Sequence, residues 1–365
     1  MILLTIGILL ILVICFIYFY VNYLPLRKAL WIKFNPNWKK MAKVYEFPKD
    51  DEIQEEKYPL ISATVFRDLA DVIWHEKELE PPQALFTDLP YGSVVHINSK
   101  HVSRFIDMVL PKLKSNIVLL TGYDTMSPAV PGYEKIIESD NILHWFLQNY
   151  DLDPKYYQNG KVSLMPLGFN FHKLDPRSDN TSIDMGLPSI LGNQQLTMKK
   201  IRSQLPKLKD RPCIAYANFH LNMDTFLRDP MAKTRANARQ DAMEKLSGKS
   251  FVKFEAKQSP RNEVWRNLKN YSFEISPRGN GIDCHRTYEA IFFNTIPIVK
   301  STSIDSLFND LPIVIVNNWE DVTADNLKRW KEKYENVVDG DIPKVLYAAY
   351  WKEKFNQFKK IEHYQ

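Results

Sequence analysis

The stretch from Phe273 to Val299, FEISPRGNGIDCHRTYEAIFFNTIPIV, constrains the fold more than any other part of the chain. It predicts a short apolar strand over Phe273–Ile275, a loop with two glycines, a helix of about ten residues and a second strand over Ile296–Val299. A β-loop-α-β unit of this kind belongs to an α/β fold with a parallel sheet.

Charged residues in this stretch indicate a binding site for phosphate groups. The helix is expected to begin just after Asp283 as its N-cap, so that its free backbone N–H groups and positive dipole end face the loop. Arg278 and Arg286 add positive charge there. Glu289 follows Arg286 by one helical turn on the same face and is expected to point past the phosphates towards sugar hydroxyls. The set suits a nucleoside diphosphate-sugar.

The runs SPRGNG, HRTYEA and IPIV resemble the donor-binding signature of exostosin-like glycosyltransferases, glycosyltransferase family 47 and its relatives. The resemblance implies a GT-B fold, in which two Rossmann-like domains face each other across a cleft and the C-terminal one binds the sugar nucleotide. It implies that Arg278 and Arg286 contact the diphosphate of a donor substrate, expected to be a UDP-sugar, and that Glu289 contacts the ribose or sugar. No further cofactor is expected. The other residues of the expected donor site are Gly279, Gly281 and His285.

The sequence departs from the family pattern at Asn294, where the family has glycine. Asn is the best non-glycine residue for a left-handed helix C-terminus, so the local geometry can be kept. A plain structural turn stays an alternative for the whole stretch, because glycine-rich strand-to-helix turns occur in many α/β proteins.

Composition is that of an ordinary globular protein. With 365 residues, 45% apolar and 25% charged, the length suits two domains of ~150 residues behind an anchor. A net charge of +5 without a concentrated basic tract in the body does not favour nucleic-acid binding. Of three cysteines, Cys15 lies in the apolar N-terminus, which leaves at most one disulfide in the body and no zinc-ligand spacing.

The first residues predict a membrane anchor. Residues 2–21 carry no charged side chain and are long enough to cross a hydrocarbon core of ~30 Å. A cleaved signal peptide is the alternative, although no small-x-small cleavage site follows. The positive-inside rule predicts a cytosolic body, whereas the family resemblance implies a luminal, Golgi- or ER-type body, and both stay open. The rule rests on six basic residues after the span: Arg27, Lys28, Lys33, Lys39, Lys40 and Lys43.

The rest of the chain predicts two Rossmann-like domains from short apolar runs separated by helical segments. The segment VSRFIDMVLPKL, between the first two strands, shows helical periodicity up to its proline. Aromatic residues after Asp321 are spaced as one apolar side of a C-terminal helical region, expected to cross back onto the first domain. The strands are expected at 93–97, 117–121, 142–146, 162–164, 214–217, 251–254, 271–275, 296–299 and 313–316. The predicted divisions are an anchor at 1–21, a basic juxtamembrane segment and stem at 22–58, an acceptor-side domain at 59–205, a donor-binding domain at 206–335 and the crossing helix at 336–365.

A base for the acceptor hydroxyl is expected in the first domain. Asp124 is the leading candidate because it follows an apolar strand, where ligands of α/β proteins collect, although capping of a turn explains it equally well. His220 and Asp224, after the first strand of the second domain, are the next candidates. Arg235 and Arg239, on a predicted helix, are secondary candidates for phosphate contacts, although charged residues on an exposed helix face more often simply face solvent. No paired carboxylates of the metal-binding kind follow a strand, so no metal is expected.

These observations favour a membrane-anchored glycosyltransferase that moves a sugar from a nucleoside diphosphate-sugar to a glycan or glycoprotein. One alternative is a fucosyltransferase-type GT-B enzyme, whose donor domain also places a Glu-bearing helix before a proline-containing strand. Another is a catalytically inactive, membrane-tethered glycan-binding module. A response to GDP-fucose in a donor screen would support the first alternative. Nucleotide binding without sugar transfer would support the second.

Overall fold

A computed structural model describes residues 60–123, 127–153, 155–158, 160–171, 191–219, 232–255, 261–279 and 281–359. The chain divides into two compact units, Met1–Gln54 and Glu55–Gln365, and all described residues belong to the second. The predicted anchor and stem therefore lie outside the described residues. Among the described helices, none combines the length and apolar character that a membrane crossing requires.

The first sheet is five-stranded and wholly parallel, with the strands side by side in chain order. The four predicted strands of this part of the chain are confirmed, and a further edge strand, β1, precedes them. Every residue of β2 and β3 is buried, as in parallel sheets covered on both faces. The strands are β1 (Val72–Trp74), β2 (Ser93–Asn98), β3 (Ile117–Gly122), β4 (Ile142–Leu147) and β5 (Val162–Leu164).

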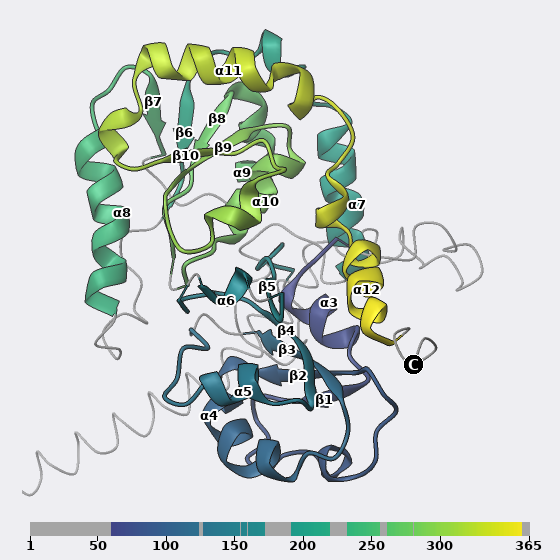
Figure 1. The fold of residues 1–365 in the computed structure, drawn as a ribbon. Helices are drawn as coiled ribbons and strands as arrows, with labels where there is room; N and C mark the ends of the chain where they lie inside the picture. Colours follow the sequence, from purple (N-terminus) through teal and green to yellow (C-terminus); the bar gives the residue numbers. More distant parts are fainter. Residues whose placement is uncertain are drawn as a thin grey trace, which may run out of the picture. The chain divides into compact units, whose positions relative to one another are not determined.

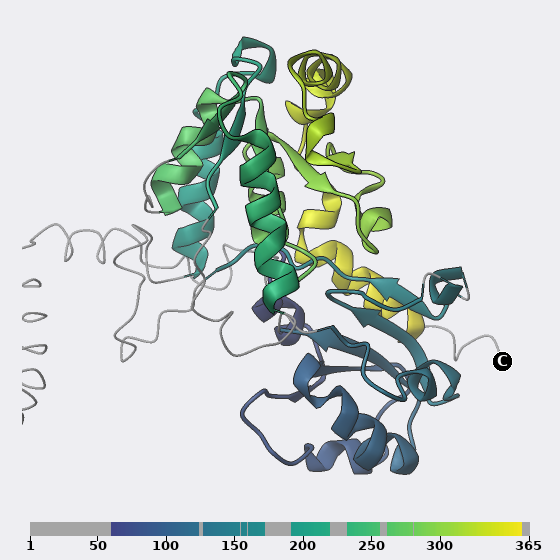
Figure 2. The ribbon, with the colours of Figure 1, turned by 90° about the vertical axis from the view of Figure 1, so that its left-hand side faces the viewer.

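The strand order of this sheet differs from the predicted Rossmann-like arrangement. Each crossover advances towards the same edge, so the order never reverses. Right-handed crossovers that always advance one way place their helices on one face, which leaves the other face to helices from elsewhere. Figure 2 shows α3 (Ala63–Asp68) and α12 (Ala348–Asn356) on one side of the sheet and α4 (Val102–Arg104) on the other.

The second sheet is also five-stranded and parallel, in the order β10-β9-β8-β6-β7 (Figure 1). All five predicted strands are confirmed. The order reverses between β6 and β8, which makes this sheet doubly wound like those of nucleotide-binding α/β proteins. The strands are β6 (Ala215–Ala217), β7 (Val252–Phe254), β8 (Phe273–Ile275), β9 (Ile296–Lys300) and β10 (Val314–Val316).

The helix predicted for VSRFIDMVLPKL forms with a change of winding. α4 continues as a π-helical turn over Phe105–Val109 and a 3-10 turn over Leu110–Lys112, where Pro111 lies in the first turn. The remaining helices are α5 (Glu134–Glu138), α6 (Lys155–Gln158), α7 (Leu191–Arg202), α8 (Ala232–Leu246), α9 (Arg261–Asn267), α10 (His285–Phe292) and α11 (Ala324–Val338).

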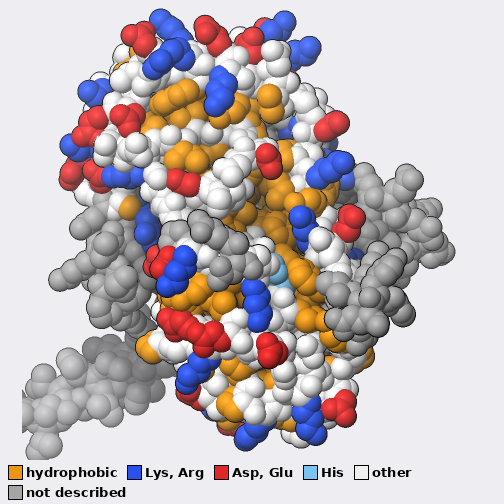
Figure 3. All heavy atoms as spheres, in the orientation of Figure 1, with side chains coloured by type: hydrophobic (Ala, Val, Ile, Leu, Met, Phe, Trp, Pro, Cys, Tyr) orange, Lys and Arg blue, Asp and Glu red, His pale blue; other side chains and the backbone are white. Residues whose placement is uncertain are grey.

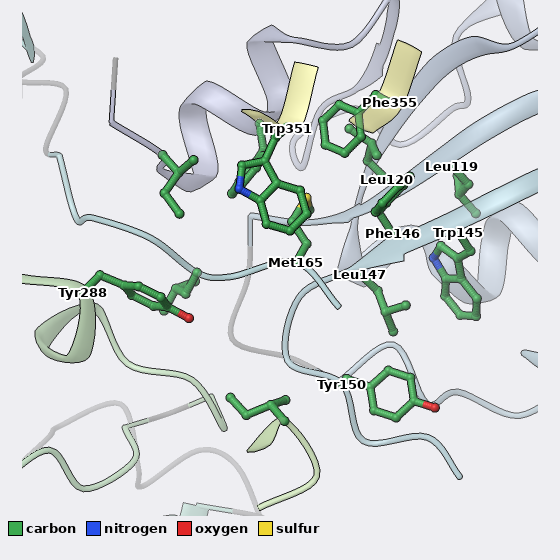
Figure 4. Packing of buried hydrophobic residues seen from close by; sticks show 14 of the residues in the cluster. Leu119, Leu120, Trp145, Phe146, Leu147, Tyr150, Met165, Tyr288, Trp351 and Phe355 are labelled. Atoms are coloured by element: carbon green, nitrogen blue, oxygen red, sulfur yellow. The ribbon is translucent and has the colours of Figure 1, made fainter. Parts of the chain in front are cut away.

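The aromatic residues near the C-terminus pack into two separate hydrophobic cores and do not form one continuous apolar side. Trp330 and Tyr334 of α11 pack against the cluster of the second sheet. Trp351 and Phe355 of α12 are buried against the first sheet, where the Phe355 ring lies 4.9 Å from that of Phe146 on β4. Figure 4 shows Trp351, Phe355 and Phe146 in one apolar cluster. The two helices are separated by a segment with Gly340 and Pro343, which ends the continuous pattern expected from the sequence.

Hydrogen bonds connect loops at the ends of the two sheets. The Leu167 N–H donates to Asp283 Oδ2 at 2.7 Å, and the His285 Nδ1–H donates to the Gly168 carbonyl at 2.7 Å. The Ser303 hydroxyl donates to the Tyr150 carbonyl at 2.6 Å. Figure 3 shows that acidic and basic side chains are interspersed on one face of the molecule, without a large area of one sign.

Candidate functional site

The loop after β8 starts at the reversal of strand order in the second sheet. β6 and β8 are neighbours there, and the chain leaves β8 through Ser276–Gly281 before α10 begins at His285. Ligands of open α/β sheets bind at the carboxyl ends of the strands at such a reversal. The topology therefore places the charged loop predicted from the sequence where an α/β sheet binds ligands.

Hydrogen bonds and close packing fix the loop. The Ser276 and Thr287 hydroxyl oxygens lie 2.9 Å apart, which joins the end of β8 to α10. Gly281 has no space for a side chain, because a Cβ there would overlap the side chain of Asn149. A Cβ at Gly279 would lie 3.1 Å from Arg239 Nη2. Neither glycine has a positive φ, so close packing against protein atoms is the observed requirement.

Three arginines gather around this loop. Arg239 of α8 donates from Nε to the Arg278 carbonyl at 3.2 Å. Burial, and next the nearby Arg286 charge, lower the pKa of Arg239 to about 10. The Arg286 guanidinium lies 5.9 Å from the centre of the Phe219 ring, in the segment after β6. The side chain of Arg235, the other secondary candidate, lies outside the described residues.

Arg286 also faces a buried acid that was not predicted from the sequence. Its Nε lies 3.4 Å from Oε1 of Glu274, which is 1% exposed in the middle of β8. Burial raises the pKa of Glu274 to about 8, while the Arg286 charge opposes the rise. The sequence did contain a signal for this contact: Glu274 lies inside the apolar run SFEIS, and a buried carboxylate needs a partner.

Glu289, expected at the sugar, has protein partners on both carboxylate oxygens. Arg261 Nη2 donates to Oε1 at 2.6 Å and the Trp265 indole N–H donates to Oε2 at 3.0 Å. Both partners belong to α9, and the Glu289 side chain is 9% exposed. These contacts fasten α10 to α9. A carboxylate has about four acceptor positions, so a sugar hydroxyl as a third partner stays a prediction.

The expected N-cap of the signature helix is wrong by one residue. Cys284, with extended backbone, occupies the N-cap position of α10 and makes no side-chain cap. The Asp283 carboxylate accepts instead from Leu167 N–H and the Tyr288 hydroxyl. Burial raises the pKa of Asp283 to about 6, against the effect of these hydrogen bonds. The tertiary partners outweigh the local capping preference. His285 donates from Nδ1 to the Gly168 carbonyl, and a ligand contact by its ring stays a prediction.

A pocket of about 510 Å³ adjoins the loop at the carboxyl ends of β8 and β9. The loop contributes Pro277 and Arg278, and the first residues of α10 contribute Cys284 and Thr287. Lys300, at the end of β9, adds a cation that is paired with Asp241 of α8 at 3.0 Å. The lining thus combines two cations, Arg278 and Lys300, with two acids, Asp241 and Asp283, beside the start of α10.

The structure does not test the residues predicted as catalytic bases. Asp124, His220 and Asp224 all lie outside the described residues. Within the described ranges, His, Cys, Asp and Glu side chains form no group able to hold a metal ion.

No protein-family model and no curated protein sequence matches the chain. Among solved structures, an α1,3-fucosyltransferase with GDP-fucose is similar over 82% of this chain and 96% of that chain, with 13% identity and a TM-score of 0.33. A GtfA/B complex is similar over 74% of this chain and 58% of that chain, with 10% identity and a TM-score of 0.34. The catalytic domain of starch synthase IV from Arabidopsis thaliana, bound to ADP and acarbose, is similar over 73% of each chain, with 10% identity and a TM-score of 0.31. Likenesses at this level establish no family for the chain.

Proposed function

We propose that the chain is a glycosyltransferase of the GT-B type that transfers a sugar from a nucleoside diphosphate-sugar to a glycan or glycoprotein. One observation carries this proposal: the loop with Arg278 follows β8 at the reversal of strand order, beside Arg286 and Arg239, and adjoins a pocket of about 510 Å³. Parallel sheets use this position for ligands, and the cations suit a diphosphate.

The proposed chemistry uses positive charge to stabilise the leaving group. As the glycosidic bond to the donor breaks, negative charge grows on the departing diphosphate, and arginines and the N-terminal N–H groups of α10 favour that charge. The acceptor hydroxyl must lose its proton, and Asp124 or His220 is the proposed base. Gly279, Gly281 and His285 complete the proposed donor site. Neither a divalent cation nor another cofactor is part of this proposal.

The exostosin-like subtype and a UDP-sugar donor are proposed from the runs SPRGNG, HRTYEA and IPIV. A donor panel tests them. The full chain is heated with UDP, GDP and ADP, with the corresponding nucleotide sugars and with pyrophosphate. A ligand at 100 times its dissociation constant stabilises the folded state by ~2.7 kcal/mol. We expect the largest shift with a UDP-sugar, whereas a preference for GDP-fucose would favour the fucosyltransferase alternative.

Transfer to an acceptor distinguishes an enzyme from a binding module. The chain is incubated with the stabilising donor and a glycan array, and release of the nucleoside diphosphate is measured. Binding without release or hydrolysis would favour the inactive module, and no shift with any nucleotide would contradict the proposal.

We further propose that residues 2–21 anchor the chain in a membrane, with a single pass. Orientation has two candidates, because the basic residues after the span favour a cytosolic body and the resemblance favours a luminal one. Glycan occupancy of Asn180, in the acceptor sequence NTS, would establish the lumen. Digestion of the body by protease added to sealed microsomes would establish the cytosol.

A further inference from the structure

Glu274 is the one charged residue of β8, and a strand buried in a sheet is an unusual place for an acid. It lies between Phe273 and Ile275, and its side chain is 1% exposed. Side chains alternate across a strand, so Glu274 lies on the face of the sheet opposite to Phe273 and Ile275, which belong to the hydrophobic core of the second sheet. The transfer chemistry proposed above gives this acid no role.

Glu274 pairs with Arg286 of α10 through one carboxylate oxygen. Arg286 Nε lies 3.4 Å from Oε1, whereas Oε2 has no hydrogen-bond partner among the described residues. A buried carboxylate with only one oxygen compensated is costly in its ionised form, and a proton on the carboxyl group removes much of that cost. The geometry therefore favours a neutral Glu274 beside a charged Arg286.

Two charged residues of α10 act on Glu274 in opposite directions. The Arg286 charge favours the ionised carboxylate, and the Glu289 charge favours the protonated form. Glu289 is itself paired with Arg261 of α9, whose Nη2 lies 2.6 Å from Oε1. Burial has the largest effect and raises the pKa of Glu274 to about 8. A small change in the charge near Arg286 therefore decides whether Glu274 holds its proton close to neutral pH.

The residues beside Glu274 on the neighbouring strands bring no charge. Tyr216 of β6 and Pro297 of β9 are in register with Glu274. Burial raises the pKa of Tyr216, so its phenol stays neutral over the range in which Glu274 titrates. Proline has no titratable side chain. The proton on Glu274 is therefore controlled from α10.

Arg286 connects this buried acid to the proposed donor site. Its Nη1 lies 3.6 Å from Cys284 Sγ, and Cys284 lines the pocket of about 510 Å³ beside the loop after β8. A diphosphate held by Arg286 would bring negative charge to the guanidinium. Like charges disfavour the ionised form of a nearby carboxyl group, so the bound diphosphate would favour protonated Glu274.

We propose that Glu274 is a positioning residue that acts on the donor site through Arg286, and that a diphosphate bound at Arg286 drives a proton from solvent onto the Glu274 carboxylate. The inference rests on the proposed function, because it requires Arg286 to contact the donor. Ionised Glu274 holds the guanidinium and competes with the diphosphate, whereas protonated Glu274 leaves the Arg286 charge to the ligand. Diphosphate affinity is therefore highest below about pH 8 and falls above it.

Calorimetry with UDP tests the coupling, with GDP in its place if GDP binds more tightly. The full chain carries Cys284→Ser throughout, because thiols ordinarily titrate near pH 8.5. The dissociation constant should rise about threefold or more between about pH 7 and about pH 9. Near pH 8, two buffers of different ionisation enthalpy should report uptake of ~0.3–0.5 proton for each nucleotide bound. Adding Glu274→Gln should remove both effects, because an amide does not titrate, and the nucleotide's own titration cancels in the comparison.

Glu332→Gln, at an exposed position of α11, is the matched control and should keep both effects. Nucleotide binding with the same pH dependence in the presence and absence of Glu274 would overturn this inference and leave the proposed function standing. If neither UDP nor GDP binds, the proposed function fails and this inference fails with it. If Glu274→Gln does not fold, proton uptake by the Cys284→Ser chain near pH 8 decides, and binding without uptake would overturn the inference.

Discussion

Arg286 lies against the buried acid Glu274 and is a proposed contact of the donor diphosphate. We expect Arg286→Ala to weaken pyrophosphate and nucleoside diphosphate binding about ten- to a hundredfold, because a charge-assisted contact contributes ~1.5–3 kcal/mol. Calorimetry on the full chain measures the change. Arg329→Ala, on the exposed part of α11, is the matched control. Wild-type affinity in Arg286→Ala would contradict a phosphate contact.

Substitutions at Glu289 and Arg261 should have coupled effects on the stability of the fold. Their ion pair is largely buried, so either single change leaves a charged or polar group without its partner. We expect Glu289→Gln and Arg261→Met to destabilise the fold by ~1–3 kcal/mol each and the double variant to lose less than the sum. Urea unfolding measures the cycle. Strict additivity would show that the pair contributes nothing and would leave Glu289 available to a ligand.

Glu274 predicts a dependence of stability on pH. Its pKa in the folded state is raised to about 8 from 4.5, so the folded state holds a proton that the unfolded state releases. The contribution of Glu274 to the free energy of unfolding should therefore fall as pH rises from 4.5 to about 8, by up to ~1.4 kcal/mol per pH unit. Unfolding curves above about pH 7.5 largely avoid the contributions of His96, His144 and Asp283 to the slope. Glu274→Gln should flatten the slope there, and an unchanged slope would exclude this origin.

The C-terminus of α10 depends on a left-handed residue, as expected from the sequence. Asn294 has a φ of 54°, two residues after the helix ends at Phe292. Asn294→Ala should cost ~1 kcal/mol and Asn294→Gly less, because only glycine and asparagine adopt this backbone readily. Thermal unfolding compares them with Asn309→Ala, at an exposed position with a φ of −53°. Equal losses at positions 294 and 309 would contradict the backbone explanation.

Strands were predictable from the sequence because they are short, mostly apolar runs bounded by turns, and the nine expected strands all exist. β1 (Val72–Trp74) was missed, although several of the predicted strands are equally short. The order of the strands within each sheet could not be predicted from the sequence, because an apolar run does not indicate at which edge of the sheet the next strand is added. The partners of Glu289 and Asp283 were equally hidden, because Trp265 and Leu167 come from segments distant in sequence.

At the scale of the whole molecule, we expect transfer to proceed without a divalent cation. Guanidinium groups around the loop after β8 supply the positive charge that a departing diphosphate needs. Product formation by the full chain is compared in EDTA, in manganese and in neither. Equal rates are expected, and activity abolished by EDTA and restored by manganese would require a metal in the mechanism.

Ile61 lies at the start of the described chain and is hydrogen-bonded on both sides. Its N–H donates to the Leu346 carbonyl at 2.9 Å, just before α12, and its carbonyl accepts from Phe169 N–H at 2.8 Å. The neighbouring Gly168 accepts from His285, the first residue of α10. A mechanical pull on the chain ahead of residue 60 would therefore load the segment before α12 and the 168–169 loop together. Tension on the N-terminal segment would reach the loop that holds His285 before it reached any strand of either sheet.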